Sequence, residues 1–396
     1  MVKRLLASAL VLGTVSGCAL IAQVTGHSGR RAPAAPARLA PDPTLLTRPS
    51  TEIRHRPDGT VLVEGQPFFP LGFYHVSWAR GGTTEGRRED LRRLSQAGFN
   101  LMVTEPINDR DVRDFEQTLN AARGEGVYVL SYGLGDAAVG RVGHHPAVLG
   151  FKLADDSNAL VRPEEVQRRH AHLKALSPEK LTYISLSVGY DRPETAYFGV
   201  SDMVGNQSYP VGSDDIAVTY RVMRSAVESA LARRSVPIAN LQTFAWGGGK
   251  PLPTEAELRN MTYQALMAGV KGIVYYAYRS REVDLTREPR LWQAAGTLAS
   301  EIAQLSPALL EGQRQELSDG NAGRPVVVML RGRGGTFLLA LNNSRTQTQA
   351  VHLSLAGAPN GWRVLAGKAS ALTRRGGQVS GRLAPLEVVA YRLDGH

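Results

Sequence analysis

The sequence predicts an α/β protein built on a (β/α)8 TIM barrel, followed by a small C-terminal antiparallel β-sandwich. Eight short apolar runs alternate with amphipathic helical segments over roughly 240 residues, which is the length such a barrel needs. The runs are almost continuously apolar, as expected for parallel strands covered on both faces. After about Gly323 the pattern changes to short strands and turns without helical segments, which predicts the sandwich.

The expected strands begin at Pro70, Phe99, Val127, Leu149, Leu181, Asp202, Pro237 and Gly272. Between them, segments such as REDLRRLSQAG and VRDFEQTLNAARGEG have helical periodicity. Thr254 and Glu257 form a capping box that predicts a helix start, and Gly269 predicts its end. A doubly wound open sheet is the alternative, but no glycine-rich phosphate-binding fingerprint follows the first strand.

The N-terminus has the pattern of an export signal. Lys3 and Arg4 precede an apolar stretch at residues 5–15 that is short for a membrane span. The following Val-Ser-Gly-Cys sequence resembles the lipobox of bacterial lipoproteins, which implies acylation of Cys18 and a lipid anchor in the cell envelope. Ala19 stands where an inner-membrane retention signal has Asp, so the resemblance favours the outer membrane. An ordinary secretion signal with an incidental cysteine is the alternative.

Four parts of the chain follow from these patterns. We expect a lipoprotein signal peptide at residues 1–18, a disordered tether rich in Ala, Pro, Arg and Gly at 19–50, the barrel at 51–315, and the sandwich at 324–396. The turn signals at Asp58-Gly59 and Glu64-Gly65 predict an N-terminal β-hairpin on the barrel. Cys18 is the only cysteine, which excludes an intrachain disulfide.

The chain carries a formal charge of +10, mostly from arginines that look scattered along the sequence. Nucleic-acid-binding proteins usually gather such charge on one face or helix. We therefore expect no nucleic-acid partner, and interpret the excess as a solvated surface with a mild preference for anionic envelope polymers.

Several segments, taken in order, resemble (β/α)8-barrel glycoside hydrolases of the beta-galactosidase-like clan. They are GQPFFPLGFYHV at the first strand, HPAVLGFKLADD at the fourth, VGNQSYP at the sixth, and LQTFAW with PLPTEAELRNMTYQALMAGVKGIVYYAY over the seventh and eighth. The resemblance covers most of residues 51–310, and the sandwich also fits such enzymes. It implies a barrel that acts on a polysaccharide or oligosaccharide at the C-terminal ends of its strands.

Glycoside hydrolysis commonly needs two carboxyl groups. Alternation along the fourth strand should aim Leu149, Phe151 and Leu153 at the helices, and Gly150, Lys152, Ala154 and Asp156 at the barrel axis. Asp156 then lies where the family has its catalytic Glu, and Asp155 can join it only if the strand bends. A pair of solvated loop carboxylates, or Asp155 capping the next helix, is the alternative.

The sequence departs from the family pattern at three places. Gln242 stands near the end of strand seven, where many retaining members have a carboxylate nucleophile. Gln207 replaces the Asp of the sixth-strand motif. Asp156 is shorter than Glu by about one C–C bond, roughly 1.5 Å, and a misplacement of about 1 Å can cost a hundredfold in rate.

Two chemistries survive these losses. An adjacent acidic pair resembles the arrangement in substrate-assisted N-acetylhexosaminidases, where one acid orients the acetamido group of the substrate and the next protonates the leaving oxygen. Alternatively, Glu105 at the end of strand two is the second carboxylate, unless it forms a salt bridge to an Arg or to Lys152.

Polar and aromatic residues near strand ends suit a sugar, although we expect some of the aromatics to be barrel packing. The candidate substrate-binding residues are Tyr74, Trp78, Asn206, Gln207, Tyr209, Asn240, Gln242, Trp246, Tyr276 and Tyr278. No metal-ligand spacing such as H-E-x-x-H and no G-x-S-x-G elbow is present, so we expect no metal and no cofactor.

Three functions therefore compete. The first is a glycoside hydrolase acting on an envelope or extracellular polysaccharide. The second is a catalytically degenerate barrel that binds glycans without cleaving them, and the third is a structural envelope lipoprotein that uses the barrel as a scaffold.

Overall fold

The computed structural model describes residues 51–74, 83–187, 195–280, 282–355, 359 and 361–393. Cys18 and Trp78 lie outside the described residues, so the predictions made for them stay predictions. Within the described residues, none of the helices has the length and apolar composition needed to cross a bilayer.

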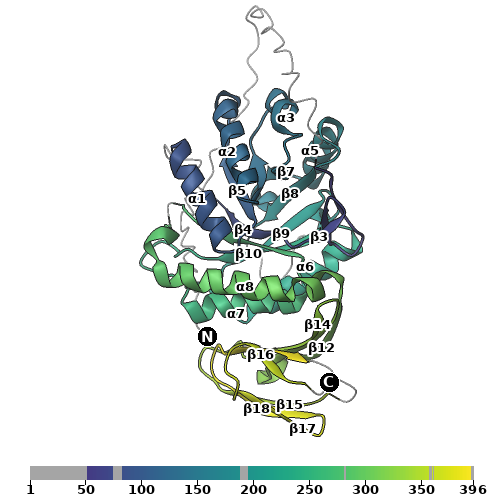
Figure 1. Ribbon diagram of the computed structural model, residues 1–396, viewed down its shortest axis with the longest axis vertical. Helices are drawn as coiled ribbons and strands as arrows, with labels where there is room; N and C mark the ends of the chain where they lie inside the picture. Colours follow the sequence, from purple (N-terminus) through teal and green to yellow (C-terminus); the bar gives the residue numbers. More distant parts are fainter. Residues whose placement is uncertain are drawn as a thin grey trace, which may run out of the picture. The chain divides into compact units, whose positions relative to one another are not determined.

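Eight parallel strands form a closed barrel, which confirms the predicted fold class (Figure 1). The strands are β4 (Leu71–Tyr74), β5 (Leu101–Pro106), β6 (Tyr128–Tyr132), β7 (Val148–Ala154), β8 (Leu181–Leu186), β9 (Met203–Ser208), β10 (Val236–Gln242) and β11 (Gly272–Tyr276). Each pairs with its neighbour in sequence, and β11 pairs with β4 to close the ring. Each of the eight expected apolar runs therefore supplies one barrel strand.

Helices connect the strands. They are α1 (Thr84–Gln96), α2 (Val112–Gly124), α3 (Asp136–Val142), α4 (Ser157–Leu160), α5 (Pro163–Leu176), α6 (Val218–Ala232), α7 (Glu255–Ala268) and α8 (Pro289–Glu311). The capping box at the start of α7 is present, since Thr254 accepts from the Glu257 N–H while the Glu257 carboxylate accepts from the Thr254 N–H. Gly269 ends this helix with a φ of 102°, a left-handed conformation that glycine tolerates without strain.

A three-stranded antiparallel sheet precedes the barrel, so the predicted hairpin gains one strand. It comprises β1 (Ile53–His55), β2 (Val61–Val63) and β3 (Gln66–Phe68). The Ile53 N–H donates to the Glu179 carbonyl just before β8, and the Lys180 ammonium donates to the Thr51 carbonyl. This sheet therefore lies at the N-terminal end of the barrel strands, opposite the end where an active site is expected.

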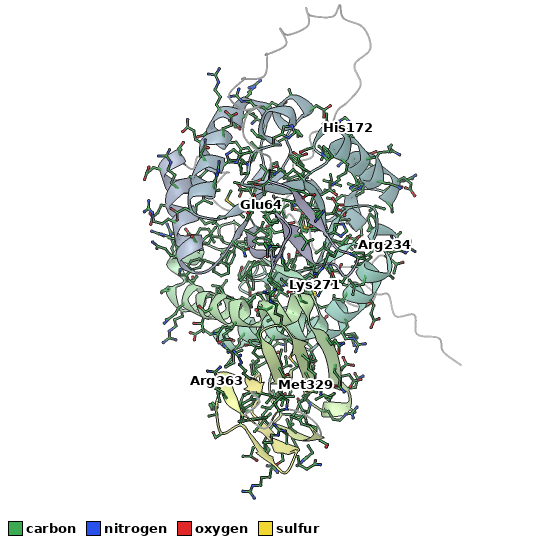
Figure 2. All side chains as sticks on the ribbon, turned by 45° about the vertical axis from the view of Figure 1, so that its right-hand side comes forward. Glu64, His172, Arg234, Lys271, Met329 and Arg363 are labelled. Atoms are coloured by element: carbon green, nitrogen blue, oxygen red, sulfur yellow. The ribbon has the colours of Figure 1, made fainter. Side chains whose placement is uncertain are left out.

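Two antiparallel sheets form the C-terminal sandwich. The five-stranded sheet has the order β12 (Gln313–Asp319), β13 (Val326–Gly332), β14 (Gly335–Leu341), β19 (Val388–Leu393), β16 (Arg363–Ala366). The three-stranded sheet has the order β15 (Gln349–Ser354), β18 (Gln378–Leu383), β17 (Leu372–Arg375). Met329, labelled in Figure 2, belongs to the apolar core that the two sheets share. Strand β12 lies in and just before the interval between the two predicted domains, so the sandwich begins before residue 324.

The five-stranded sheet also packs against the barrel helices. Val326, Val328 and Leu330 belong to the same apolar cluster as the barrel interior and α8. The buried Asn260 side chain of α7 donates to the Asn342 carbonyl at 2.8 Å. The Glu316 carboxylate of β12 accepts hydrogen bonds from Tyr220 and Arg224, both on α6. These contacts join the sandwich to the barrel by both apolar and polar interactions.

The strand register decides which side chains point into the barrel. Residues paired between neighbouring parallel strands face the same side, and Ser185 pairs with Gly205 while Gln207 pairs with Asn240. A Cβ atom on Gly205 would lie 2.3 Å from the Tyr183 hydroxyl and 2.5 Å from the Asn240 side-chain oxygen. Gly205 therefore points inward, and its missing side chain makes room inside the barrel for the hydrogen bond from Tyr183 on β8 to Asn240 on β10.

Candidate active site at the C-terminal end of the barrel

Strand β7 contains a bulge immediately before its two acidic residues. Lys152 pairs with Tyr183 on β8, whereas Ala154, two residues later, pairs with Ile184. Two residues of β7 thus oppose one residue of β8, which reverses the alternation of side chains beyond this point. The Leu153 carbonyl at the bulge accepts a hydrogen bond from the Arg169 guanidinium of α5 at 3.1 Å.

Because of the bulge, Asp155 takes the inward position beside Ser185. Its carboxylate accepts a hydrogen bond from the Ser185 hydroxyl and lies 2.9 Å from the Lys152 ammonium. A bulge, rather than the expected bend at the strand end, thus turns Asp155 inward. The strict alternation used to place Ala154 and Asp156 on the barrel axis does not hold beyond Leu153.

Lys152 is the buried cation of the site. Its side chain is 1% exposed, and its ammonium lies 4.3 Å from the centre of the Tyr74 ring and 4.7 Å from the centre of the Tyr132 ring. Two aromatic faces and one carboxylate therefore compensate its charge where water has little access. The Lys152 ammonium and the Asp155 carboxylate therefore form an ion pair whose cation is almost fully buried.

The local backbone conformation, rather than strand alternation, places the Asp156 side chain at the barrel mouth. Its backbone is left-handed, with a φ of 42°, and it occupies the N-cap position of α4 without using its side chain as a cap. Its carboxyl oxygen instead accepts a hydrogen bond from the Gln207 amide of β9 at 2.6 Å. Burial raises the pKa of the Asp156 carboxyl, and the negative charge of Asp155 raises it further.

Burial and the charges of both carboxylates raise the pKa values of two nearby tyrosines. Burial raises the pKa of Tyr132 on β6, and the charges of Asp155 and Asp156 add to this effect. Burial also raises the pKa of Tyr209 at the end of β9, to which both carboxylates contribute. The acidic pair therefore lies between β6 and β9 at the mouth of the barrel, and neither carboxyl belongs to the helix-facing side.

Asp156→Asn is expected to stabilise the fold more at neutral pH than in acid. The folded state raises the pKa of Asp156, so this group stabilises the fold below its unfolded pKa, and that contribution is lost as the pH rises through the folded pKa. Asn cannot titrate, and its side-chain oxygen can keep the Gln207 hydrogen bond. Urea unfolding from about pH 3 upward should show the stability difference between variant and wild type growing to a plateau. A pH-independent difference would contradict the assigned shift.

An aromatic cluster lies beside the acidic pair. The ring of Tyr209 is 6.0 Å from that of Tyr276, and Tyr276 is 5.9 Å from Tyr74. The Trp246 indole donates to the Tyr209 carbonyl at 3.1 Å, and Phe244 packs between Trp246 and Tyr276. Trp246 and Tyr276 are partly exposed, whereas Tyr74 and Tyr209 are almost fully buried. The two partly exposed rings are thus the better candidates for stacking on a sugar.

Two predicted sugar-binding residues face the helices instead. Tyr278 is buried against Phe73 and Trp292, and its hydroxyl donates to Asp90 of α1 at 3.1 Å. Asn206 alternates with the inward residues Gly205 and Gln207, so it shares the outer side of β9 with Val204. For these two residues the structure corrects the prediction, because a position near a strand end does not fix the side that a residue faces.

Two predicted amides take part in contacts within the protein. Gln242 is fully buried, and its amide accepts from the Val211 N–H and donates to the carbonyls of Val211 and Phe244. It holds the segment after β9 in place, so its groups are not presented to a sugar. Asn240 accepts a hydrogen bond from Tyr183 at 2.9 Å inside the barrel, and its NH₂ group has no partner in the described structure.

Glu105 is half-buried at the C-terminal end of β5, so it belongs to the same end of the barrel as the acids of β7. Its role as a second carboxylate stays a prediction. Tyr132, Tyr183 and Ser185 also belong to the site, although they were not predicted from the sequence. Their positions on expected strands were the available signal, but their chemistry becomes visible only when Asp155 is placed beside them.

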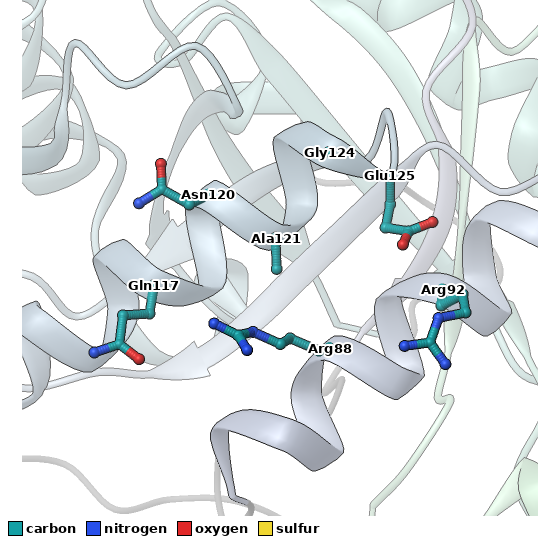
Figure 3. A pocket seen from close by; sticks show the side chains of 7 residues that line it. All are labelled: Arg88, Arg92, Gln117, Asn120, Ala121, Gly124 and Glu125. Atoms are coloured by element: carbon teal, nitrogen blue, oxygen red, sulfur yellow. The ribbon is translucent and has the colours of Figure 1, made fainter.

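Two surface grooves lie away from the acidic pair. One of about 470 Å³ runs between α1 and α2, and Figure 3 shows the residues that line it, among them Arg88 and Arg92 of α1 and Gln117 and Asn120 of α2. A second lies between α7 and α8. Both are on the helical exterior, far from the chemistry of the barrel mouth. No group of three or more potential metal ligands occurs among the described side chains.

No protein-family model matches the sequence, and a search of curated proteins gave no matching relative. Solved structures do match. A protein described as a glycoside hydrolase superposes with a TM-score of 0.61 at 13% identity, covering 87% of this chain and 94% of its own. A family 5 glycoside hydrolase from Bacteroides vulgatus gives 0.61 at 14%, covering 87% and 93%. The protein AmyP, solved with maltose, gives 0.57 at 12%, covering 82% and 96%. At these identities the likeness establishes the shared barrel fold.

Proposed function

We propose that this protein is a glycoside hydrolase acting on an envelope or extracellular polysaccharide, with Asp156 as the general acid. The observation that carries the proposal is the pair of adjacent carboxyls at the C-terminal end of β7, held in different environments. Asp155 pairs with a buried ammonium, whereas Asp156 is buried beside an amide and its pKa is raised. When the environments of two neighbouring carboxyls push their pKa values apart, the carboxyl with the raised pKa is assigned as the acid and the other as the base or charge stabiliser.

In this mechanism the Asp156 carboxyl holds a proton and delivers it to the glycosidic oxygen as that bond breaks. Asp155 stays ionised beside Lys152. In the substrate-assisted form, the Asp155 carboxylate accepts a hydrogen bond from the N–H of a 2-acetamido group, whose oxygen attacks the anomeric carbon. Glu105 is the second carboxylate in the alternative form, in which the enzyme itself supplies the nucleophile or base.

Structural likeness and side-chain chemistry support a sugar as substrate. The similar solved structures include glycoside hydrolases, and one of them, AmyP, was solved in complex with maltose. The partly exposed Trp246 and Tyr276 offer rings for stacking on pyranose faces. A screen of envelope polysaccharides and aryl glycosides, including N-acetylhexosaminides, tests the proposal. If none of these substrates releases product, the proposed hydrolase function is wrong.

One observation favours a second candidate, a barrel that binds glycans without cleaving them. At the end of β10, Gln242 stands in place of an acid, and its amide is fully engaged with backbone groups. If Glu105 does not act as the second carboxylate and the substrate lacks an acetamido group, Asp155, engaged with Lys152, is the carboxylate left beside Asp156 at the end of β7. Glycan binding without product release would therefore establish this second function. The third candidate, a scaffold lipoprotein, requires neither binding nor release.

We further propose that Cys18 is acylated and anchors the protein in the cell envelope, with the outer membrane as its destination. Two acyl chains or more give stable anchoring where a single chain does not. Cys18→Ser is expected to move the protein from the detergent-extracted membrane fraction to the soluble fraction, as followed by immunoblotting of fractionated cells. Unchanged partitioning of the variant would contradict the lipid anchor.

A further inference from the structure

Between the barrel and the C-terminal sandwich, the net positive charge lies in the sandwich. From the start of β12, residues 313–396 contain 11 Lys and Arg but four Asp and Glu, a net charge of +7, whereas residues 51–312 contain 29 basic and 31 acidic residues, a net charge of −2. Residues 1–50 carry the remaining +5. Within the barrel and the sandwich, the net positive charge that looks scattered along the sequence therefore gathers in one small domain of the fold. A field of one sign over one surface attracts polymers of the opposite sign.

The outer face of the three-stranded sheet displays part of this charge. On β17 and β18, the exposed Arg375 and Arg382 lie on the side opposite the buried Leu372, Val379 and Leu383. Arg375 pairs with Gln378, and Arg382 follows four residues later on β18, so the two are about 13 Å apart along the strand. We call this side of β15, β17 and β18 the basic face.

The rest of the basic face is polar. Strands β15, β17 and β18 contain no Asp or Glu, and Ser380 stands between Thr373 and His352 in the register. In the part of the chain that the structure describes, no ion pair involves Arg375 or Arg382. The five-stranded sheet, in contrast, packs against α7 and α8, so the basic face is the side of the sandwich turned away from the barrel helices (Figure 1).

The chemistry of this face discriminates between anionic partners. Binding in a membrane interface needs apolar side chains that enter the acyl region. Among the described residues, the exposed large apolar side chains are Leu160 and Leu231, both on the barrel. Single-stranded nucleic acids need aromatic platforms, whereas the aromatic pair of the sandwich, Trp362 and Tyr391, stacks ring on ring at 4.1 Å with Tyr391 buried. Arginines among hydroxyl and amide groups fit a chain that carries both carboxylates and hydroxyls.

We infer that the basic face binds an acidic polysaccharide and holds it for the barrel. The inference rests on the proposed function for the choice of a polysaccharide, but its own support is the charge distribution and the polar surface. Arg375 and Arg382 each bind a carboxylate or ester-anion group on the polymer, and the neighbouring hydroxyl and amide side chains contact sugar hydroxyls. Both arginines are exposed to solvent, so their electrostatic attraction to the polymer weakens as salt is added.

The test is affinity electrophoresis of the full-length chain through gels containing polygalacturonate, dextran sulfate or neutral dextran. The chain carries Cys18→Ser so that acylation plays no part. Both acidic polymers should retard the protein and neutral dextran should not, with the retardation falling between about 0.05 and 0.5 M salt. The double variant Arg375→Gln, Arg382→Gln should bind about tenfold more weakly, a loss of about 1.4 kcal/mol. The double variant Arg123→Gln, Arg233→Gln removes two exposed barrel charges and should bind as the parent does.

Equal weakening by both double variants would overturn the inference, because net charge alone would then explain binding. Tighter binding to phosphatidylglycerol vesicles or to duplex DNA than to either acidic polysaccharide would also overturn it. The catalytic proposal has a separate readout, because hydrolysis of small aryl glycosides does not need the basic face. If the protein hydrolyses aryl glycosides but does not bind the acidic polymers, only the inference about the basic face is wrong. If it binds the polymers but hydrolyses nothing, only the proposed hydrolase function is wrong.

Discussion

Asp156→Asn is expected to lower the turnover of glycoside hydrolysis by about 10²–10⁴, the usual contribution of a positioned general acid. The amide keeps the shape of the side chain and can still accept the hydrogen bond from Gln207. It cannot donate a proton to the leaving oxygen. The measurement is the initial rate of product release under saturating substrate, which isolates turnover from binding.

Glycan affinity provides the matched control, because substrate should still bind Asp156→Asn with close to the parental dissociation constant. Glu105→Gln serves as the comparison, since Glu105 is the other acid at this end of the barrel. Full activity in Asp156→Asn, with a large loss in Glu105→Gln, would show that the acid had been assigned to the wrong residue.

Lys152→Met is expected to destabilise the fold by about 2–4 kcal/mol. Breaking a fully buried ion pair costs about 3–5 kcal/mol, and here the Asp155 side chain is 28% exposed, which lowers the cost. Met has an unbranched apolar side chain of similar shape, but it lacks the ammonium group. It loses the charge opposite Asp155 and the contacts of that charge with the Tyr74 and Tyr132 rings. Urea unfolding at neutral pH measures the change.

The double variant Lys152→Met, Asp155→Asn separates the ion pair from simple packing. It removes the uncompensated carboxylate, so it should recover more than half of the stability that Lys152→Met loses. Arg168→Met breaks an exposed ion pair with Glu165 and should change stability by less than about 1 kcal/mol. A loss in Lys152→Met no larger than in this control would mean that the buried pair is not a stabilising element.

The barrel could be predicted from the sequence because its signal is periodic. Each of the eight apolar runs is long enough to identify a strand, and the capping box at Thr254 marks its helix without ambiguity. The position of the acidic pair at a strand end also followed from the order of the segments. Strand identity and strand direction together place the site at one end of the barrel.

The orientation of individual side chains could not be predicted as well. A single bulge after Lys152 reverses the alternation of side chains and turns Asp155 inward. The sequence FKLADD contains no pattern that predicts this bulge. Tyr278 lies beyond β11 and packs under α1 and α8, although Tyr276, two residues earlier, faces the site. Such details depend on tertiary register, which one sequence does not contain.

The distribution of charge was visible in the sequence and was missed. Counted by domain, residues 1–50 carry a net charge of +5, the barrel at 51–312 is slightly acidic at −2, and the sandwich at 313–396 carries +7. Counted over the whole chain, the same residues look scattered because arginines with nearby acids are spread through the barrel helices. The separation matters only once the fold shows that these residues form their own pair of sheets.

The dependence of the hydrolysis rate on the leaving group shows most directly whether Asp156 donates a proton to the glycosidic oxygen. Aryl glycosides whose phenols differ in pKa need different degrees of protonation as the bond breaks. For Asp156→Asn, we expect near-parental rates of bond cleavage with strongly acidic phenols, and losses that grow toward about 10⁴ as the phenol becomes a weaker acid. A loss of the same size for every leaving group would contradict this expectation, because Asp156 would then act in some way other than as the proton donor.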